Sequence, residues 1–324
     1  MAALARRTFV IGVVLVAIIG SIVYLKLRAQ EEVHVPEFET IIILHTNDSH
    51  GCLLPEGNLG GFAYIASIVN NEREQNSGRV LLLDAGDIVD GCPIGSMFYG
   101  RSVITVMNAM GYDAMTLGNH DVAKYGIKEG QGVIPIENDY LMDLKENAEF
   151  PLLVANVLIN GSKPFPSYVI EEVGGVRIGI IGVTTQWNPP SENVEILDPV
   201  TTANECVEEI EDNVDFIIAL THLGLWADEQ FASVVKGVDI IIGGHSHDIM
   251  WEPENVGGTM IVQAGYRGKY IGRIQLEYDV KNHEIANFSY ELIEVFNPLL
   301  EEDEEIAELV EYYENIISPL IPGG

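Results

Sequence analysis

The chain has 324 residues, 47% of them hydrophobic, and a formal net charge of −32. This length can hold one large α/β domain or two small ones. The charge argues strongly against a nucleic-acid-binding protein, because binding a phosphate backbone requires clustered Lys and Arg to displace counterions. A small anionic substrate would need a local positive centre, which bound cations can provide.

The N-terminus contains an uncharged apolar run at residues 9–25, between Arg6–Arg7 and Lys26. Its length is near the lower limit for a membrane span of roughly 20 residues and exceeds a usual signal-peptide core. No clean cleavage site follows. We therefore expect a transmembrane anchor at residues 1–28, with the catalytic part membrane-anchored on the extracytoplasmic side; a cleaved signal and a secreted protein are the alternative. The paired arginines also fit, weakly, a twin-arginine export signal. Residues 29–40, which are polar, read as a linker.

From residue 41 onward, short apolar runs alternate with segments that fit amphipathic helices, which is typical of an α/β fold. Strands are expected at 41–44, 80–83, 114–117, 151–157, 168–173, 177–183, 216–220, 239–242, 260–263, 271–280 and 284–295. Helices are expected at 60–75, 102–110, 201–212, 228–236 and 301–317. The last three strands should complete a second sheet. The acidic helix at 301–317 should present a solvated face.

The stretch after the third of these strands is the most informative. Residues 115–117 favour a strand, and Gly118 permits a sharp turn that would leave Asn119 and His120 at the carboxyl edge of the sheet. Open α/β sheets place their chemistry at this edge. Asn offers a neutral oxygen to a metal, and His can act as an acid or a ligand, so this pair suits an ion beside a proton donor.

Polar side chains follow five of the predicted strands in the same way. They are Asp48, His50, Asp87, Asp90, Asn119, His120, His222, His245 and His247. Strand-end placement brings them to one rim of the fold. A single His at a strand end is more often a satisfied polar group than a ligand, but carboxylates, imidazoles and an amide together suit divalent transition metals, and two ions need a carboxylate to bridge them. His45, which ends a strand, is left undecided.

The three cysteines lack the spacing of a metal site, and a disulfide framework is not expected. Cys52 and Cys92 each follow a glycine in a predicted site loop. One bridge between them is the less favoured alternative, because sequence cannot fix the geometry that bridging requires.

Asp-x-His, Gly-Asp-x-x-Asp-Gly, Gly-Asn-His-Asp, a His after a strand and Gly-His-x-His occur in this order. In this order the motifs resemble the calcineurin-like metallophosphoesterases. The stretches 46–51, 108–114 and 266–272 further resemble the catalytic domain of the 5′-nucleotidase branch. The resemblance implies a catalytic domain at 41–296 that folds as a four-layer α/β sandwich of two sheets with helices outside. Residues 297–324 would then be an acidic helix and tail.

The resemblance also implies a site for two divalent metal ions. One metal would be held by Asp48, His50 and His247, the other by Asn119, His222 and His245, and Asp87 would bridge them. The ligands leave Mn, Zn, Fe, Co and Ni open. The implied reaction is in-line attack on phosphorus by a metal-bound hydroxide, with His120 binding the phosphate and protonating the leaving oxygen.

The chain departs from the 5′-nucleotidase pattern beside its catalytic histidine. That branch usually carries an Asp three residues after the histidine, where this chain has Ala123. Asp90, three residues after Asp87, matches the wider calcineurin-type pattern instead. We expect Asp90 to replace the missing partner of His120; the alternative is that Asp90 only caps a turn.

The expected function is hydrolysis of nucleotides or similar small phosphate esters. Cyclic-nucleotide or other phosphodiester hydrolysis, and cleavage of a sulfur ester as in the thiosulfohydrolase relative, are alternatives. A membrane-tethered binding module on the same fold is the non-enzyme alternative. In full-length 5′-nucleotidases a C-terminal domain grips the nucleoside, and this sequence ends at the helix that would lead into it. Nucleotide specificity is therefore expected only by analogy.

Overall fold

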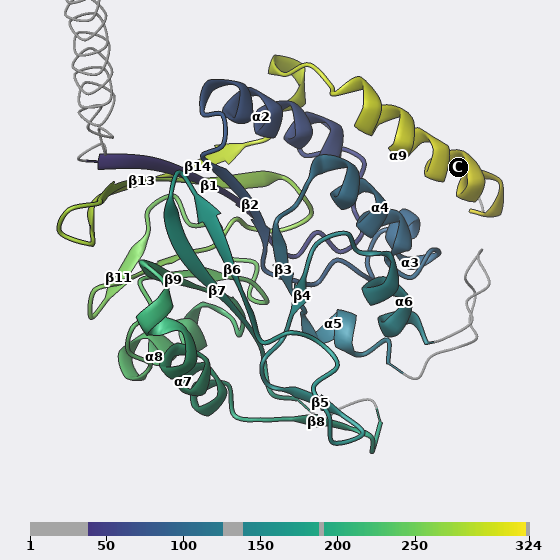
Figure 1. Ribbon diagram of the computed structural model, residues 1–324. Helices are drawn as coiled ribbons and strands as arrows, with labels where there is room; N and C mark the ends of the chain where they lie inside the picture. The colour runs from purple at the N-terminus through teal and green to yellow at the C-terminus, as the bar shows by residue number, and fades with distance from the viewer. Residues whose placement is uncertain (1–37, 126–138, 188–190, 322–324) are drawn as a thin grey trace, which may run out of the picture. The chain divides into compact units, whose positions relative to one another are not determined.

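The computed structural model describes residues 38–125, 139–187 and 191–321 (Figure 1). The anchor predicted at 1–28 and most of the predicted linker lie outside the described residues. The linker prediction extends too far, because strand β1 already begins at Phe38. Within the described ranges, no helix combines the length and apolar character needed to cross a membrane.

The first sheet has the strand order β14-β13-β1-β2-β3-β4. Its parallel part comprises β1 (Phe38–Thr46), β2 (Val80–Asp84), β3 (Ala114–Thr116) and β4 (Leu152–Leu153). The hairpin of β13 (Tyr270–Asp279) and β14 (Glu284–Glu294) continues this sheet, since β13 pairs antiparallel with β1. The prediction that this hairpin completes the second sheet is therefore wrong. Both sheets have antiparallel edge strands, and the apolar pattern of the hairpin does not specify which sheet it joins.

The second sheet has the order β11-β12-β10-β9-β7-β6. Its parallel strands are β7 (Val176–Thr184), β9 (Phe216–His222), β10 (Ile240–Gly243) and β12 (Thr259–Val262), flanked by antiparallel β6 (Tyr168–Val173) and β11 (Glu254–Val256). The predicted strand at 151–157 is split. Its start forms β4, and its last residue begins β5 (Val157–Ile159), which pairs with β8 (Val194–Ile196) in a separate ribbon.

Helices cover the outer face of each sheet (Figure 1). The larger helices beside the first sheet are α2 (Phe62–Gln75), α4 (Arg101–Met110), α6 (Tyr140–Asn147) and α9 (Glu304–Ile317). The second sheet is covered by α7 (Pro199–Ile210) and α8 (Leu225–Val234). Short turns of helix are α3 (Pro93–Ser96), α5 (Asn119–Val122), η1 (Glu211–Asn213), η2 (Asn297–Leu299) and η3 (Ser318–Leu320).

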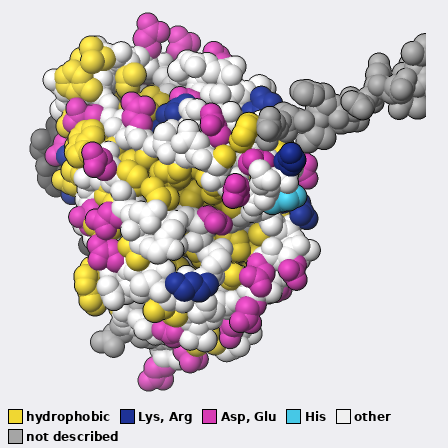
Figure 2. All heavy atoms as spheres, turned by 90° about the vertical axis from the view of Figure 1, so that its left-hand side faces the viewer, with side chains coloured by type: hydrophobic (Ala, Val, Ile, Leu, Met, Phe, Trp, Pro, Cys, Tyr) yellow, Lys and Arg dark blue, Asp and Glu magenta, His cyan; other side chains and the backbone are white. Residues whose placement is uncertain are grey.

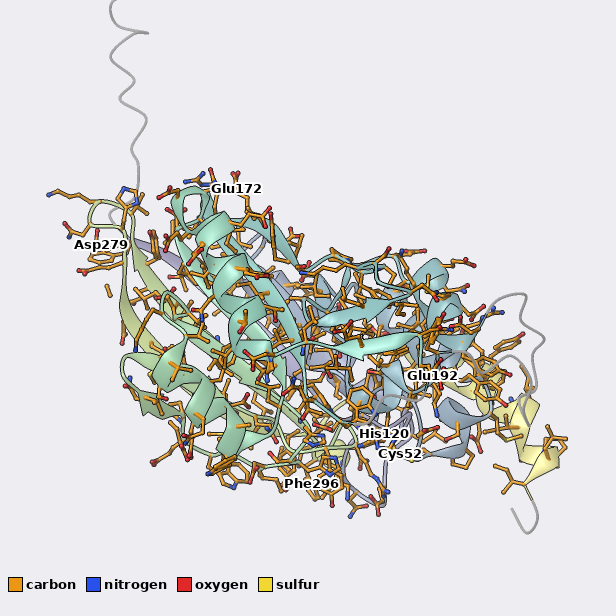
Figure 3. The ribbon with its side chains drawn as sticks, turned by 90° about the horizontal axis from the view of Figure 1, so that it is seen from below. Cys52, His120, Glu172, Glu192, Asp279 and Phe296 are labelled. Atoms are coloured by element: carbon orange, nitrogen blue, oxygen red, sulfur yellow. A yellow bond between two sulfur atoms is a disulfide. The ribbon has the colours of Figure 1, made fainter. Side chains whose placement is uncertain are left out.

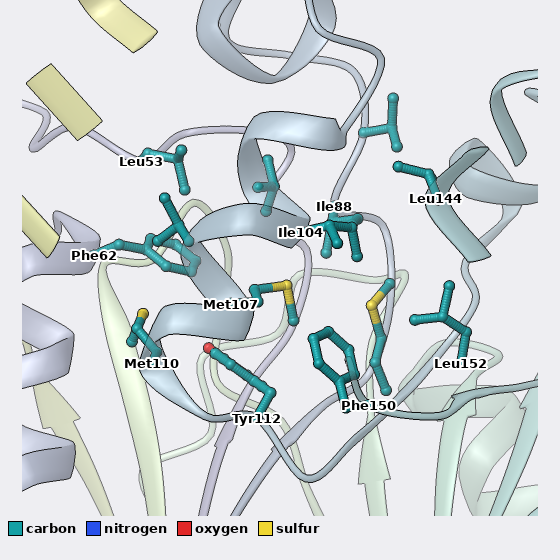
Figure 4. Packing of buried hydrophobic residues seen from close by; sticks show 14 of the residues in the cluster. Leu53, Phe62, Ile88, Ile104, Met107, Met110, Tyr112, Leu144, Phe150 and Leu152 are labelled. Atoms are coloured by element: carbon teal, nitrogen blue, oxygen red, sulfur yellow. The ribbon is translucent and has the colours of Figure 1, made fainter. Parts of the chain in front are cut away.

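Three apolar clusters hold these layers together. Along β1, Ile41 and Ile43 point into the cluster between the two sheets, whereas Ile42 and Leu44 point into the cluster under the helices. Side chains alternate across a strand, so a strand buried on both faces must be apolar throughout, as the sequence pattern indicated. Figure 4 shows the helix-side cluster, in which Ile104, Met107 and Met110 of α4 lie among aromatic and aliphatic side chains. Each fully buried side chain of this size contributes about 1.5–3 kcal/mol.

Helix α9 is more than a solvated face. Ile306, Val310 and Ile317 are buried in the helix-side cluster, and the helix contacts α2 and α4. Asp303 caps it by accepting a hydrogen bond from the backbone N–H of Ile306. The described chain from Phe38 onward therefore forms one compact unit that includes this helix. Figure 2 shows acidic side chains spread over one face of the molecule, with few Lys or Arg among them.

Candidate metal centre

The predicted site residues come together at the carboxyl ends of the parallel strands. Asp48 and His50 follow β1, Asp87 and Asp90 follow β2, and the Asn119 loop follows β3. From the second sheet, His222 ends β9, and His245 and His247 follow β10. His120 marks this rim in Figure 3. The contacts below show which of these loops the structure brings together at this rim.

The first cluster consists of Asp48, His50 and His247, whose ligand atoms all lie within 4.8 Å of one another. His247 Nε2 is 3.2 Å from Asp48 Oδ1, and His50 Nε2 is 3.8 Å from the same oxygen. The two imidazole Nε2 atoms are 3.0 Å apart. This is the set that the resemblance implied for one metal.

The second cluster consists of Asp87, His222 and His245, again within 4.8 Å. His222 Nε2 lies 3.1 Å from Asp87 Oδ2 and 3.9 Å from Asp48 Oδ1, so the two clusters adjoin. His222 Nδ1 is 2.7 Å from the carbonyl oxygen of Ala85. Nδ1–H donating there leaves Nε2 free as a ligand, an arrangement that orients metal-binding histidines.

Asn119 is placed less directly. It begins helix α5, and its Oδ1 is buried without a hydrogen-bond partner among the residues that the structure describes. The backbone N–H of His120 donates to Asp87 Oδ1 over 2.8 Å, which joins the Asn119 loop to the second cluster. The structure thus groups Asp87 with His222 and His245, and the bridging role of Asp87 and the ligand role of Asn119 stay predictions.

The backbone of the site is strained. Six of the nine predicted residues have φ values of 48° to 77°, a region that residues with a Cβ rarely adopt. They are Asp48, His50, Asp87, Asp90, His245 and His247. Such conformations cost about 1–3 kcal/mol each and persist where the surroundings impose them, often at functional sites.

The donor set fits divalent cations. Asp48 Oδ1, Asn119 Oδ1 and His222 Nε2 are all buried, and among the described residues none makes a hydrogen bond of normal geometry, although His222 Nε2 lies 3.1 Å from Asp87 Oδ2 and His247 Nε2 lies 3.2 Å from Asp48 Oδ1. An unpaired buried polar atom costs about 1–3 kcal/mol, so three at one point need an explanation. Burial opposes charge on His222, but the carboxylates of Asp87 and Asp48 outweigh it and raise the pKa of His222 to about 10. The two buried carboxylates thus demand positive charge at this point, and mixed oxygen and nitrogen ligands suit transition metals.

His120 lies at the edge of this cluster with the predicted partner. Its Nδ1 is 3.4 Å from Asp90 Oδ2, and its ring meets that of His50 edge-on with 5.3 Å between centroids. The hydrogen bond to Asp90 raises the pKa of His120, although partial burial opposes this. The ammonium group of Lys124, which was not predicted, also contacts Asp90 Oδ2.

Asp121 was not predicted as a site residue, although it ends the Gly-Asn-His-Asp motif. Its buried carboxylate accepts four backbone N–H bonds, from Asp87, Ile88, Val89 and Gly118, over 2.8–3.1 Å. It therefore joins the Asp87 loop to the Asn119 loop. An acidic residue at the third position of a helix, after a glycine, is the signal that could have identified it.

Gln263, the residue that follows β12, was also not predicted as part of the site. Gln263 Oε1 accepts from the backbone N–H of Asp248 (2.5 Å) and from the hydroxyl of Ser246 (3.3 Å), and its Nε2 donates to the carbonyl of Gly244 (3.2 Å). These bonds hold the loop that carries His245 and His247. No motif in the sequence indicated this role.

Cys52 and Cys92 form a disulfide, so the less favoured alternative is correct. The bond joins the His50 loop to the Asp90 loop. Cys206 is a buried free thiol.

Gly118 is required for a different reason from the one predicted. Its φ of −84° is not left-handed. A Cβ there would lie 2.1 Å from Asp87 Oδ1, so only glycine allows the carboxylate to approach. His45, left undecided, is a core residue: it is fully buried against Gly272 and Tyr290, and burial lowers its pKa to about 3.

Comparison with known sequences supports this geometry. The calcineurin-like phosphoesterase family model matches residues 41–248. The 5′-nucleotidase of Bos taurus is 32% identical over 306 residues, which cover 82% of this chain and 51% of that protein. The trifunctional nucleotide phosphoesterase protein YfkN of Bacillus subtilis is 30% identical over 276 residues, or 74% of this chain and 18% of that protein. The chain spans about half the length of the 5′-nucleotidases that it matches.

Solved structures agree. The 5′-nucleotidase precursor of Thermus thermophilus superposes with a TM-score of 0.77 at 28% identity, over 88% of this chain and 60% of that one. The calcineurin-like phosphoesterase YfkN of Bacillus subtilis gives 0.75 at 26% identity, over 87% and 99%. The family match covers more than half of the chain and contains every loop of the two clusters, and so this chain belongs to the calcineurin-like phosphoesterase family.

Proposed function

We propose that this protein is a hydrolase of phosphate monoesters that depends on two divalent metal ions, and that nucleotides are its substrates. The observation that carries the proposal is the meeting of two ligand clusters, which share buried ligand atoms that make no hydrogen bond of normal geometry within the described chain, with an imidazole at their edge. The 5′-nucleotidases among its relatives support the choice of substrate.

In this proposal Asp48, His50 and His247 would hold one metal, and His222, His245 and Asn119 would hold the other, with Asp87 as a ligand shared by the two. Two such ions would supply Lewis acidity for a water nucleophile and would offset the charge of the phosphoryl oxygens. The described residues favour this arrangement because His222 Nε2 is close to a carboxylate of each cluster.

His120 supplies the proton in this proposal. Nδ1–H donating to Asp90 leaves Nε2–H to bind a phosphoryl oxygen and to protonate the leaving oxygen. Asp90 favours the protonated ring, and Lys124 keeps Asp90 in place by contacting the same oxygen. The side chain of His120 is 45% exposed, so a substrate can reach it.

The test is a substrate screen of the chain from Glu31 onward after chelation, with Mn, Zn, Fe, Co and Ni added back singly. We expect release of phosphate from nucleoside monophosphates with at least one metal and none from the chelated protein. Absence of hydrolysis with every metal and every monoester would overturn the proposal and favour a binding module.

Phosphodiester hydrolysis is the second candidate, favoured by the name of the Bacillus relative, a trifunctional nucleotide phosphoesterase. A 2′,3′-cyclic nucleotide and bis(p-nitrophenyl) phosphate separate the two functions. Faster turnover of these diesters than of the monoesters would make this candidate the main activity.

We further propose that the chain acts outside the cytoplasm, anchored by residues 9–25. The Cys52–Cys92 disulfide supports an oxidising compartment, since such bonds rarely persist in the cytosol. The full chain, expressed with and without residues 1–30, should differ in membrane association: we expect only the full chain to sediment with membranes and to resist carbonate extraction. Sedimentation of neither form would contradict an anchor.

A further inference from the structure

A pocket of about 330 Å³ lies beside the metal-ligand loops. Its apolar walls include Leu53, Leu54, Pro55, Ile94 and the Cys52–Cys92 disulfide. Leu53 and Ile94 are buried in the helix-side cluster, so this wall is fixed, whereas Leu54 at the rim is 41% exposed. The volume is at the lower end of the range for small-molecule sites, which suits one planar ring system rather than a large ligand.

Two of the residues that line the pocket are hydrogen-bonded to residues of the first metal cluster. The backbone N–H of Cys92 donates to the carbonyl of His50 over 2.8 Å, and the backbone N–H of Arg267 donates to the carbonyl of Asp48 over 2.8 Å. Tyr266 stacks on His247, with 5.2 Å between ring centroids and 15° between planes. A group bound at the cluster therefore has the pocket next to it.

Three charged residues also line the pocket. They are Arg267, Glu56 and, from α9, Glu314. Arg267 lies 3.8 Å from Glu56, whereas Lys269 approaches Glu56 to 2.6 Å, so Lys269 is the closer partner of that carboxylate. A half-exposed guanidinium with donors to spare is notable beside the anionic site of a chain with a net charge of −32. Apolar walls with a donor and an acceptor match a heteroaromatic ring, which has flat apolar faces and both kinds of polar edge.

We propose that this pocket binds the base of a nucleoside monophosphate, so that the catalytic domain itself selects esters whose leaving group, a nucleoside alcohol, carries a heteroaromatic base. The inference rests on the proposed function, which it deepens. In the pocket, Leu53, Pro55 and Ile94 contact the ring, Arg267 donates to it, and Glu314 accepts from an N–H group of the base. A phosphate ester without a base gains nothing from these contacts.

The test compares adenosine 5′-monophosphate with glycerol phosphate as substrates of the wild type and of Leu54→Trp, which fills the pocket from its exposed rim. We expect Leu54→Trp to raise KM for the nucleotide about tenfold and to leave kcat/KM for glycerol phosphate within about twofold. Arg267→Ala should also raise KM for the nucleotide and leave kcat/KM for glycerol phosphate nearly unchanged. Its backbone bond to Asp48 is retained, so the metal cluster should stay intact. Leu299→Trp is the matched control, since Leu299 is 81% exposed and does not line the pocket; it should change neither substrate.

Binding of adenosine alone, measured by calorimetry on the metal-free protein, provides a readout without turnover. We expect binding to the wild type and to Leu299→Trp, and its loss in Leu54→Trp with an unchanged melting temperature. If the protein hydrolyses neither ester, the proposed function is wrong. The adenosine measurement still shows in that case whether the pocket binds a base. Equal loss for both esters, or adenosine binding that Leu54→Trp does not weaken, would overturn this inference and leave the phosphatase proposal standing.

Discussion

The loops of the two sheets each contribute three residues to the two ligand clusters but are held in place by different means. The first-sheet loops are joined to one another by the Cys52–Cys92 disulfide and by Asp121. The loop after β10 is held from the neighbouring strand by Gln263. Cross-linking among loops fixes several ligands together, whereas Gln263 fixes a single loop. Substitutions that break the links among the first-sheet loops should therefore lower stability and metal binding more than substitutions that free the loop after β10.

Two buried aspartates show the same contrast. Asp121, between the first-sheet loops, accepts four backbone N–H bonds. Asp228, on α8 behind the second-sheet loops, is also fully buried, yet neither of its oxygens has a hydrogen-bond partner of normal geometry within the described chain. A satisfied carboxylate stabilises its surroundings, whereas an unsatisfied one is tolerated only when it is neutral.

The largest expected effect is loss of the disulfide. The bond closes a loop of 40 residues, and chain-entropy estimates for such a loop are about 4 kcal/mol. Cys52→Ser with Cys92→Ser should lower the free energy of unfolding by an amount of this order in urea titrations, and should weaken metal binding. Cys206→Ser is the control, since this thiol is unpaired. Equal stability of the double variant and the control would show that the bond does not secure the first-sheet loops.

The second largest effect is expected for Asp121→Asn, which should lower the free energy of unfolding by about 3 kcal/mol. The amide NH₂ would face backbone N–H donors and leave them unpaired. Asp113 is a matched control, since it accepts a single backbone N–H bond, from Leu82; Asp113→Asn should cost about 1 kcal/mol. Chemical denaturation of both variants measures the difference. If Asp121→Asn lowers the free energy of unfolding no more than Asp113→Asn does, Asp121 does not hold the first-sheet loops together.

Asp228 should make stability depend on pH. Burial raises its pKa to about 8, against a smaller lowering by the hydroxyl of Thr221. A group whose pKa is raised in the folded state contributes stability at low pH, and this is lost as pH rises from about 4 to about 8. Wild type should lose about 1 kcal/mol per pH unit more than Asp228→Asn between pH 5 and pH 7. Parallel pH profiles for the two proteins would mean that Asp228 is ionised and paired.

The smallest effect is expected at Asp90. Asp90→Asn keeps the shape of the side chain but removes the charge that favours protonated His120, so kcat should fall about tenfold, or about 1.4 kcal/mol. Metal content should stay that of the wild type, as measured by mass spectrometry, because Asp90 lies outside both clusters. An unchanged kcat would show that His120 relies on another group.

The sequence predicted the parts of the site that depend on strand ends. Continuous apolar runs such as 41–44 identified buried parallel strands, and the residues after them, including Asp87 and His222, reach one rim because parallel strands share a direction. Helix boundaries at α2 and α4 were also close to those observed.

Contacts between segments far apart in the chain were not predictable. The hairpin of β13 and β14 could extend either sheet by its pattern alone, and its pairing with β1 depends on packing of the whole sandwich. The Cys52–Cys92 bond needs two loops at a set distance, and Gln263 acts through backbone groups that carry no sequence signal. Asp121 could have been predicted from its place in the helix, but its bonds to the Asp87 loop could not.

If the two adjoining clusters each hold one cation, the chain binds two metal ions. The number of ions bound per chain after chelation and reloading can be measured by calorimetric titration and mass spectrometry for the wild type and for His247→Ala and His222→Ala. We expect two ions for the wild type and one for each variant. One ion or none in the wild type, under conditions that saturate binding, would contradict this expectation.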